Sequence, residues 1–285
     1  MADTLTGILS RYLGAKAWIS PRAKTNSHLE FYLRSEESDL IERSWNGAEF
    51  GEDELVAEDY LPDGGVAYAQ ISGKRVVIYV TTEGSFGQVE YNAEEGEWQP
   101  ATIVPESATP GPQSNLITLT TEKGIFLVYQ NEDQNLVSTA LGTGEGEAGH
   151  KILAEGAVLG TPMFIAPVGE QSCLFYIHTD QYIHYENVEA EGAITQKWGN
   201  SQIADPSNVK KLATVTMSEE ADAKPEVYFL EEDGSVHRVD AEGVETGAGK
   251  IEEGEFKPSN QAQCYYPPAP CCCCCRRRCC CCGRW

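Results

Sequence analysis

The chain has 285 residues, which suffices for one large domain or two small ones, and its 44 acidic residues outnumber its 21 Lys and Arg residues. The formal net charge of −23 repels phosphate backbones, so we expect no sequence-independent binding to nucleic acid. The N-terminus has no basic segment leading into an apolar stretch, and no apolar run reaches about 18 residues, so we expect neither a secretory signal nor a membrane span.

A repeated unit of about fifty residues begins at residue 15, and we expect residues 1–14 to form an N-terminal extension with at most a short helix near Thr4–Leu13. Each unit opens with a short apolar run that predicts a strand, at 15–20, 66–72, 115–121, 161–167 and 211–217. None of these runs contains Asp or Glu, so we expect no pair of catalytic carboxylates on them and no glycoside hydrolase activity.

A hairpin follows in each unit and gives the repeat its clearest signal. In the best copy, Arg75 to Tyr91, the apolar run Val76–Val80 meets a polar turn, and alternation resumes at Phe86. One aromatic residue of the hairpin's first strand recurs at intervals of 47, 50, 47 and 53 residues, at Tyr32, Tyr79, Tyr129, Tyr176 and Phe229. A fourth strand is expected after each hairpin, beginning near residues 49, 97, 150, 194 and 249.

Four strands per unit at this period are typical of a β-propeller. We therefore predict an all-β fold, a β-propeller of five four-stranded antiparallel blades over residues 15–257, with the first strand of each blade innermost around the axis. A two-layer β-sandwich is the alternative, because regular strand spacing also suits that fold.

The histidines and the short motifs suggest no chemistry. His178, His184 and His237 fall on alternating strand positions that we assign to different blades, so we expect them not to converge and predict no metal site. No glycine-rich nucleotide-binding motif follows a strand. We therefore predict a protein that is not an enzyme and has no cofactor.

The cysteines are distributed unevenly between the repeats and the C-terminal tail. Of the 11 cysteines only Cys173 lies in the repeats, at a strand position that we expect to be buried, so the propeller is expected to have no disulfide, as suits a cytoplasmic protein. Residues 258–285 form a tail rich in Pro, Cys and Arg, and we expect it to lack packed structure because it has no apolar periodicity.

Clustered cysteines beside arginines suit reversible S-acylation, which would give the protein peripheral membrane association. The lipidation candidates are Cys271, Cys272, Cys273, Cys274, Cys275, Cys279, Cys280, Cys281 and Cys282. An inert low-complexity end is one alternative, and metal or redox chemistry is another, although adjacent cysteines lack the spacing at which four ligands converge.

The repeat also carries a family resemblance. An apolar strand, an acidic turn and a strand of the form Leu40-x-Glu42-x-x-Trp45 resemble the fungal fucose-specific lectins, which are β-propellers, typically of six blades. The resemblance covers roughly residues 10–256 and is best in the first hairpin. It implies a non-catalytic, glycan-binding protein.

In that family the sugar lies between adjacent blades and is held by an arginine on the second strand, a glutamate on the third strand and nearby aromatic rings. In register, no unit keeps the arginine, whose position falls on Glu30, on Val76 or its neighbour, on Phe126, on Cys173 and on Glu226. The glutamate is kept once, as Glu42, and its equivalents are Gln88, Ser138, Tyr185 and Arg238.

The resemblance therefore implies one remaining site, between the first two blades, with the ligand-binding residues Glu42, Trp45, Gln88, Tyr91 and Trp98. Without the arginine we expect millimolar or weaker binding of a fucosylated glycan, or binding of a cationic sugar attracted by Glu30. The alternative is a scaffold whose blades bind another protein and whose tail holds it at a membrane.

Overall fold

The structure is a computed structural model that describes residues 18–21, 29–34, 39–45, 50–61, 64–142, 150–168, 171–189, 196–199, 202–215, 226–240, 242–252 and 255–259. The N-terminal extension, with the expected helix near Thr4–Leu13, and the tail with its lipidation candidates lie outside the described residues. Within those residues, no helix is both long enough and apolar enough to pass through a membrane.

The described residues form five antiparallel sheets that follow one another along the chain. Blade 1 has the order β1-β2-β3-β4, with β1 (Trp18–Pro21), β2 (Leu29–Arg34), β3 (Leu40–Trp45) and β4 (Phe50–Ala57). Blade 2 has β5 (Val66–Ile71), β6 (Lys74–Val80), β7 (Phe86–Asn92) and β8 (Glu97–Pro100), and blade 3 has β9 (Leu116–Thr121), β10 (Gly124–Gln130), β11 (Leu136–Ala140) and β12 (Lys151–Ala154).

The last two blades continue the pattern. Blade 4 has β13 (Phe164–Val168), β14 (Gln171–Ile177), β15 (Ile183–Asn187) and β16 (Gln196–Lys197). Blade 5 has β17 (Val209–Val215), preceded by a 3₁₀ turn (Pro206–Asn208), then β18 (Glu226–Glu231), β19 (Ser235–Val239), β20 (Glu245–Glu252) and β21 (Glu255–Pro258). Strand β21 was not predicted. It pairs with β20 through a tight hairpin that includes Ile251↔Phe256 and gives this blade a fifth strand.

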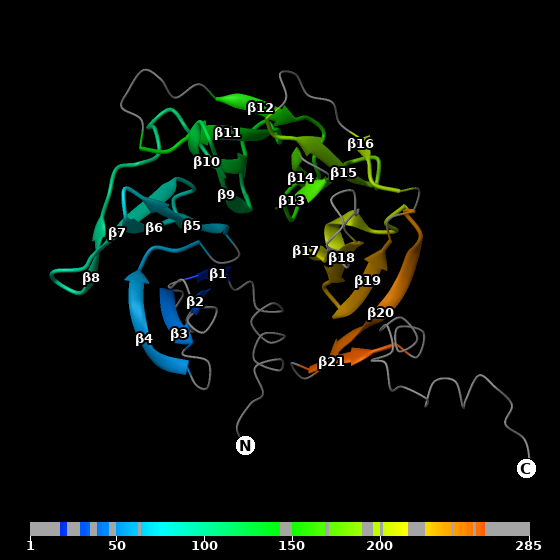
Figure 1. Cartoon of the computed structure of the whole chain (residues 1–285), viewed down its shortest axis with the longest axis horizontal. Helices are drawn as coiled ribbons and strands as arrows, with labels where there is room; N and C mark the ends of the chain where they lie inside the picture. The colour runs from blue at the N-terminus through cyan, green and yellow to red at the C-terminus, as the bar shows by residue number, and fades with distance from the viewer. Residues whose placement is uncertain are drawn as a thin grey trace, which may run out of the picture.

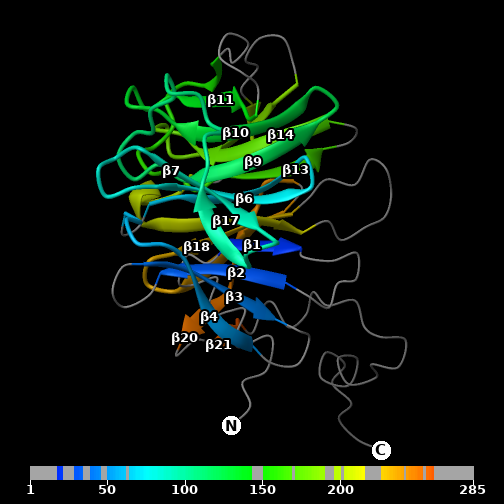
Figure 2. The same ribbon diagram turned by 90° about the vertical axis from the view of Figure 1, so that its left-hand side faces the viewer.

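The sheets lie around a common axis, as predicted. In Figure 1 the first strands β1, β5, β9, β13 and β17 lie toward the centre, and the last strands of the blades lie at the rim. Figure 2 shows the propeller from its edge. The structure therefore has the radial arrangement of a β-propeller and not the two packed layers of a sandwich.

The recurring aromatic residue of the second strand belongs, in blades 2 to 5, to the core between two blades. Tyr79 packs in the cluster shared by blades 1 and 2, Tyr129 in that of blades 2 and 3, and Tyr176 in that of blades 3 and 4. Phe229 does the same between blades 4 and 5. The fifty-residue period is thus the period at which each blade buries a ring against the blade before it.

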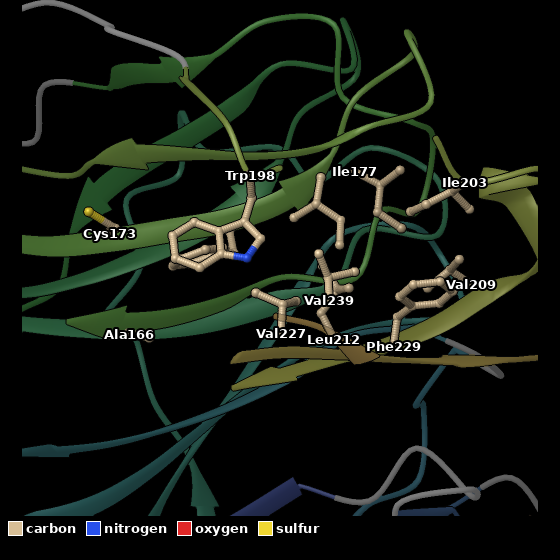
Figure 3. Packing of buried hydrophobic residues seen from close by; sticks show 12 residues of the cluster. Ala166, Cys173, Ile177, Trp198, Ile203, Val209, Leu212, Val227, Phe229 and Val239 are labelled. Carbon is tan, nitrogen blue, oxygen red and sulfur yellow. The ribbon is translucent and has the colours of Figure 1, made fainter. Parts of the chain in front are cut away.

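Blade 4 meets blade 5 over the largest of these cores, drawn in Figure 3. Trp198 lies in it with its indole against Phe175 at a ring-centroid distance of 5.3 Å, and Val227 and Leu212 of blade 5 complete the packing. Cys173 is buried there with a free thiol, and burial raises the pKa of that thiol. Burial of apolar surface between blades is the main stabilising contribution to such a fold.

Close packing restricts one position in blade 2. Gly87 stands opposite Tyr79 in the β6–β7 register, and a Cβ atom there would lie 2.1 Å from the Tyr79 ring. Glycine is required because the tyrosine ring lies directly over the neighbouring strand. The Tyr79 hydroxyl then donates to Asp59 Oδ1 at 2.6 Å, which ties the blade to the segment that enters it.

Candidate functional site

Four side chains with polar or aromatic character meet between blades 1 and 2, and strand alternation explains why. Side chains alternate between the two faces of a strand, so Arg75 on β6 shares a face with Val77 and Tyr79, which pack toward blade 1. Glu42 on β3 shares a face with Leu40, which packs toward blade 2. Two opposite charges are thereby aimed at each other across the blade interface.

The two charges form a close ion pair. Arg75 Nη1 donates to Glu42 Oε1 at 2.7 Å. The Arg75 guanidinium carbon also lies 3.8 Å from the ring centroid of Tyr91 and 5.0 Å from that of Trp98. The two rings contact each other edge to face, with centroids 5.4 Å apart. The site is therefore a guanidinium held between a carboxylate and two aromatic rings.

Burial makes this pair unusual. The Glu42 side chain is 3% exposed and the Arg75 side chain 12% exposed, whereas Tyr91 and Trp98 are only partly buried. In the part of the chain that the structure describes, Arg75 Nη2 is buried and has no hydrogen-bond partner. A buried donor without a partner costs about 1–3 kcal/mol, and more for a charged group, so this nitrogen is suited to an acceptor supplied by a ligand.

Arg75 corrects the sequence analysis, which found no arginine in the site. The predicted position falls on Val76 or its neighbour. The Val76 side chain faces blade 3, whereas the neighbour Arg75 faces blade 1 and reaches Glu42. We compared residues within one blade, whereas this arginine and glutamate come from two neighbouring blades. The sequence did hold a signal for Arg75. The β6–β7 register, continued by one pair beyond Val76↔Glu90, puts Arg75 opposite the predicted residue Tyr91, and the two are in contact.

Gln88, predicted to bind ligand, lies elsewhere. Its Oε1 accepts hydrogen bonds from the backbone N–H groups of Ile103 and Val104, both at 2.6 Å. Alternation explains this, since Gln88 and Tyr91 are three residues apart on β7 and so point to opposite faces of the sheet. Gln88 thus anchors the loop after β8. Trp45, also predicted, ends β3, and its side chain, like that of Glu30, lies outside the described residues.

A second carboxylate–guanidinium pair lies in blade 5, where the two charged residues have exchanged positions. Glu226 occupies the position at which the resemblance implies an arginine, and Arg238 occupies that of the glutamate. Arg238 Nε donates to Glu226 Oε2 at 2.7 Å, its Nη2 donates to Oε1, and the Tyr228 hydroxyl donates to Oε2 at 2.9 Å. The hydrogen bonds from Arg238 hold the pKa of Glu226 below its usual range, and burial, together with the bond to Glu226, raises the pKa of Tyr228 to about 12.

The histidines also depart from expectation. His178 and His184 flank a single hairpin turn of blade 4 and converge on Asp180, although we assigned them to different blades. His237 lies apart on β19 and stacks on Phe229.

No protein-family model and no curated protein sequence matches the chain. Solved structures do match it. AofleA from Arthrobotrys oligospora is 13% identical with a TM-score of 0.60, covering 83% of this chain and 71% of that chain. A fungal lectin from Aleuria aurantia, described as a six-bladed β-propeller with a novel fucose recognition mode, is 15% identical with a TM-score of 0.57, covering 80% and 76%. SapL1 lectin, solved with alpha methyl fucoside, is 11% identical with a TM-score of 0.56, covering 81% and 79%.

These likenesses extend over the propeller and come at low sequence identity. They confirm the predicted fold class and the resemblance to fucose-specific lectins at the level of the fold. The five sheets of the described residues are one fewer than the six blades stated for the Aleuria aurantia lectin. This chain is a β-propeller with the fold of the fucose-binding lectins.

Proposed function

We propose that the chain is a non-catalytic carbohydrate-binding propeller and that its sugar site lies between blades 1 and 2, at Glu42, Arg75, Tyr91 and Trp98. The observation that carries the proposal is the buried Arg75 guanidinium, which has one nitrogen without a hydrogen-bond partner among the described residues and lies against two partly exposed rings. The lectin fold of the solved structures supports it.

The chemistry of the four side chains suits a neutral sugar. Arg75 Nη2 donates to a sugar hydroxyl or ring oxygen, and Glu42, whose Oε1 is paired with Arg75, accepts from a neighbouring hydroxyl through its carboxylate. Trp98 packs against the apolar C–H face of the ring. Both charged groups are buried, so a sugar reaches Arg75 Nη2 and the Glu42 carboxylate only when the side chains that cover them move aside, and this movement reduces the affinity.

The expected affinity is modest. Each charge-assisted hydrogen bond contributes about 1.5–3 kcal/mol. One or two of them with one stacked ring correspond to a dissociation constant on the order of 0.1–1 mM for a monosaccharide. This is tighter than the sequence alone predicts, because Arg75 supplies the guanidinium that we expected to be absent.

Fucosides are the first ligands to test, because SapL1 lectin was solved with alpha methyl fucoside and the Aleuria aurantia lectin is described by its fucose recognition. The test is calorimetric titration of alpha methyl fucoside and of glucosamine into the full-length protein and its Glu42→Gln variant. Glu226→Gln is the matched control, since it removes the carboxylate of the other ion pair. We expect Glu42→Gln to weaken fucoside binding roughly tenfold or more and Glu226→Gln to leave it unchanged.

Each outcome decides between hypotheses. Equal loss in both variants, or binding that neither variant affects, would place the site elsewhere. Tighter binding of glucosamine than of the fucoside would assign a cationic sugar to the site. Absence of binding to any sugar by the wild type would favour the alternative function, a protein-interaction scaffold.

A further inference from the structure

A cluster of two imidazoles and one carboxylate lies at the turn between β14 and β15 in blade 4. The turn spans residues 178–182 and is held by backbone bonds from His178 N to Tyr182 O at 3.0 Å and from Gln181 N to His178 O at 2.9 Å. His178 follows the last residue of β14, and His184 is the second residue of β15. A short hairpin therefore brings both rings to one place without any long-range contact.

The ligand atoms of the three side chains lie within 4.8 Å of one another. His178 Nδ1 and His184 Nε2 each lie 3.0 Å from Asp180 Oδ1, and His184 Nε2 is 3.2 Å from Asp180 Oδ2. The two imidazole rings stack with centroids 4.4 Å apart. Two ring nitrogens thus point at one carboxylate.

One of these contacts needs a shared proton or a metal cation. His178 Nδ1 accepts a hydrogen bond from the backbone N–H of Asp180 at 3.1 Å, so this nitrogen presents a lone pair. The same lone pair faces Asp180 Oδ1, which is also an acceptor. Two acceptors 3.0 Å apart repel each other unless they share a proton or a metal cation.

The surroundings fix the rings in place. The His184 side chain is 7% exposed, and its ring also contacts Tyr176 at a centroid distance of 5.9 Å. On the other side His178 packs against the backbone of Gly156, where a Cβ atom would lie 2.6 Å from His178 Nε2. His178 and Asp180 remain partly exposed, so the cluster is open to solvent. A fixed pair of nitrogens beside an accessible carboxylate is a preorganised donor set.

We propose that His178, Asp180 and His184 form a binding site for a divalent transition-metal ion of the Zn²⁺, Ni²⁺ or Cu²⁺ class, with water completing the coordination. Imidazole nitrogen with carboxylate oxygen is the donor set that these ions prefer, whereas Mg²⁺ and Ca²⁺ favour oxygen ligands alone. The bound ion fastens the end of β14 to the start of β15.

Lys197 gives the proposal a specific signature. Its Nζ lies 2.7 Å from Asp180 Oδ2 and 3.9 Å from the ring centroid of Tyr182. An ammonium group beside the carboxylate competes with a divalent cation for the same charge. Lys197→Met should therefore tighten metal binding, roughly two- to fivefold for a half-exposed pair, whereas most substitutions near a metal site weaken it.

The test is titration of Zn²⁺ into the full-length protein after its accessible thiols have been alkylated, because thiolates are zinc ligands and the chain carries cysteines between residues 264 and 282. We expect one equivalent to bind with a dissociation constant on the order of 10 µM. Asp180→Asn and His178→Gln should weaken that binding tenfold or more. His237→Gln is the matched control, a partly buried histidine paired with a glutamate in another blade, and it should bind as the wild type does.

Circular dichroism of each variant shows whether it is folded, and Asp180→Asn preserves side-chain size in case His178→Gln is not. Tighter binding by Lys197→Met together with weaker binding by Asp180→Asn supports the site. Failure of the wild type to bind Zn²⁺, or equal binding by the wild type and folded Asp180→Asn, would overturn it.

Discussion

Two carboxylate–guanidinium pairs in this propeller have the same chemistry and different surroundings. Glu42 and Arg75 come from neighbouring blades and share one hydrogen bond, so the guanidinium keeps a buried nitrogen without a partner among the described residues. Glu226 and Arg238 lie on adjacent strands of blade 5, share two hydrogen bonds, and receive a third from Tyr228. In the first pair one guanidinium nitrogen can still donate to a ligand. In the second pair the carboxylate already accepts three hydrogen bonds.

The difference follows from where the strands place the two charges. Within one sheet, side chains on the same face of adjacent strands lie side by side. Arg238 is opposite Tyr228 and so diagonal to Glu226, close enough for the guanidinium to match the carboxylate in two bonds. Across two blades the side chains approach end to end, and here only Nη1 of Arg75 reaches the carboxylate. An ion pair between blades is therefore the better place to look for a binding site than an ion pair within one.

The largest effect should come from removing each guanidinium. Arg75→Met removes the cation that lies 2.7 Å from the Glu42 carboxylate, whose side chain is 3% exposed, and should lower the free energy of unfolding by about 3–5 kcal/mol. Arg238→Met leaves Glu226, which is 16% exposed and keeps the Tyr228 hydrogen bond, so a smaller loss is expected. Urea unfolding measures both. Equal losses would contradict the difference in burial.

Removing the charge of each carboxylate should show that both ion pairs stabilise the fold and that only the first binds sugar. Glu42→Gln and Glu226→Gln each weaken a charge-assisted pair and should each cost about 1–3 kcal/mol in unfolding free energy. Only Glu42→Gln should change the affinity for a fucoside. Thermal unfolding with and without the sugar measures both quantities in one experiment, since a ligand that binds the folded state raises Tm. A sugar-induced shift lost in Glu226→Gln would reverse the assignment.

Removing the aromatic partner of each ion pair should lower the free energy of unfolding by about 1 kcal/mol. Tyr91→Leu removes the ring 3.8 Å from the Arg75 guanidinium and should cost about 0.5–2 kcal/mol of stability together with part of the sugar affinity. Tyr228→Phe removes one hydrogen bond to Glu226, should cost about 1 kcal/mol, and should leave sugar binding unchanged. A double-mutant cycle of Tyr91→Leu with Arg75→Met measures the first coupling, and a coupling of zero would disprove the contact.

The smallest effect is a pH dependence next to the blade 5 pair. Hydrogen bonding to Glu245, together with attraction by Glu245, Glu231 and Asp233, raises the pKa of His237 against the effect of burial. A raised pKa means that the stabilisation is fully present below the ordinary histidine pKa of about 6.5 and is lost as pH rises through the folded-state value. His237→Gln should thus be more destabilising at pH 6 than at pH 8 by urea unfolding; the reverse order would show that burial dominates.

Much of the fold is predictable from the sequence because its signals are local and repeated. The hairpins are set by alternation, and the aromatic period of Tyr79, Tyr129 and Tyr176 shows where each blade packs against its neighbour. Strand β21 was missed because it follows the last repeat and has no counterpart in the other blades.

The candidate site was only partly predictable, for a different reason. Glu42, Tyr91 and Trp98 could be found from the register of each hairpin, but the partner of Glu42 is decided by how two blades face each other. The metal-binding candidates were missed because we assigned His178 and His184 to separate blades, although both flank one turn. In the first case the sequence did not show which side chains of two blades face each other, and in the second it did not show which side chains meet across one hairpin turn.

We propose that a sugar binds against Arg75 and Trp98, between blades 1 and 2. The most direct test is the ¹H–¹⁵N spectrum of the tryptophan indole groups during titration with alpha methyl fucoside, with signals assigned by Trp98→Phe and Trp198→Phe. Trp98 is partly exposed beside Arg75, whereas Trp198 is buried between blades 4 and 5. We predict that the Trp98 signal shifts in a saturable way and that the Trp198 signal does not. An unchanged Trp98 signal at saturating sugar would contradict the claim.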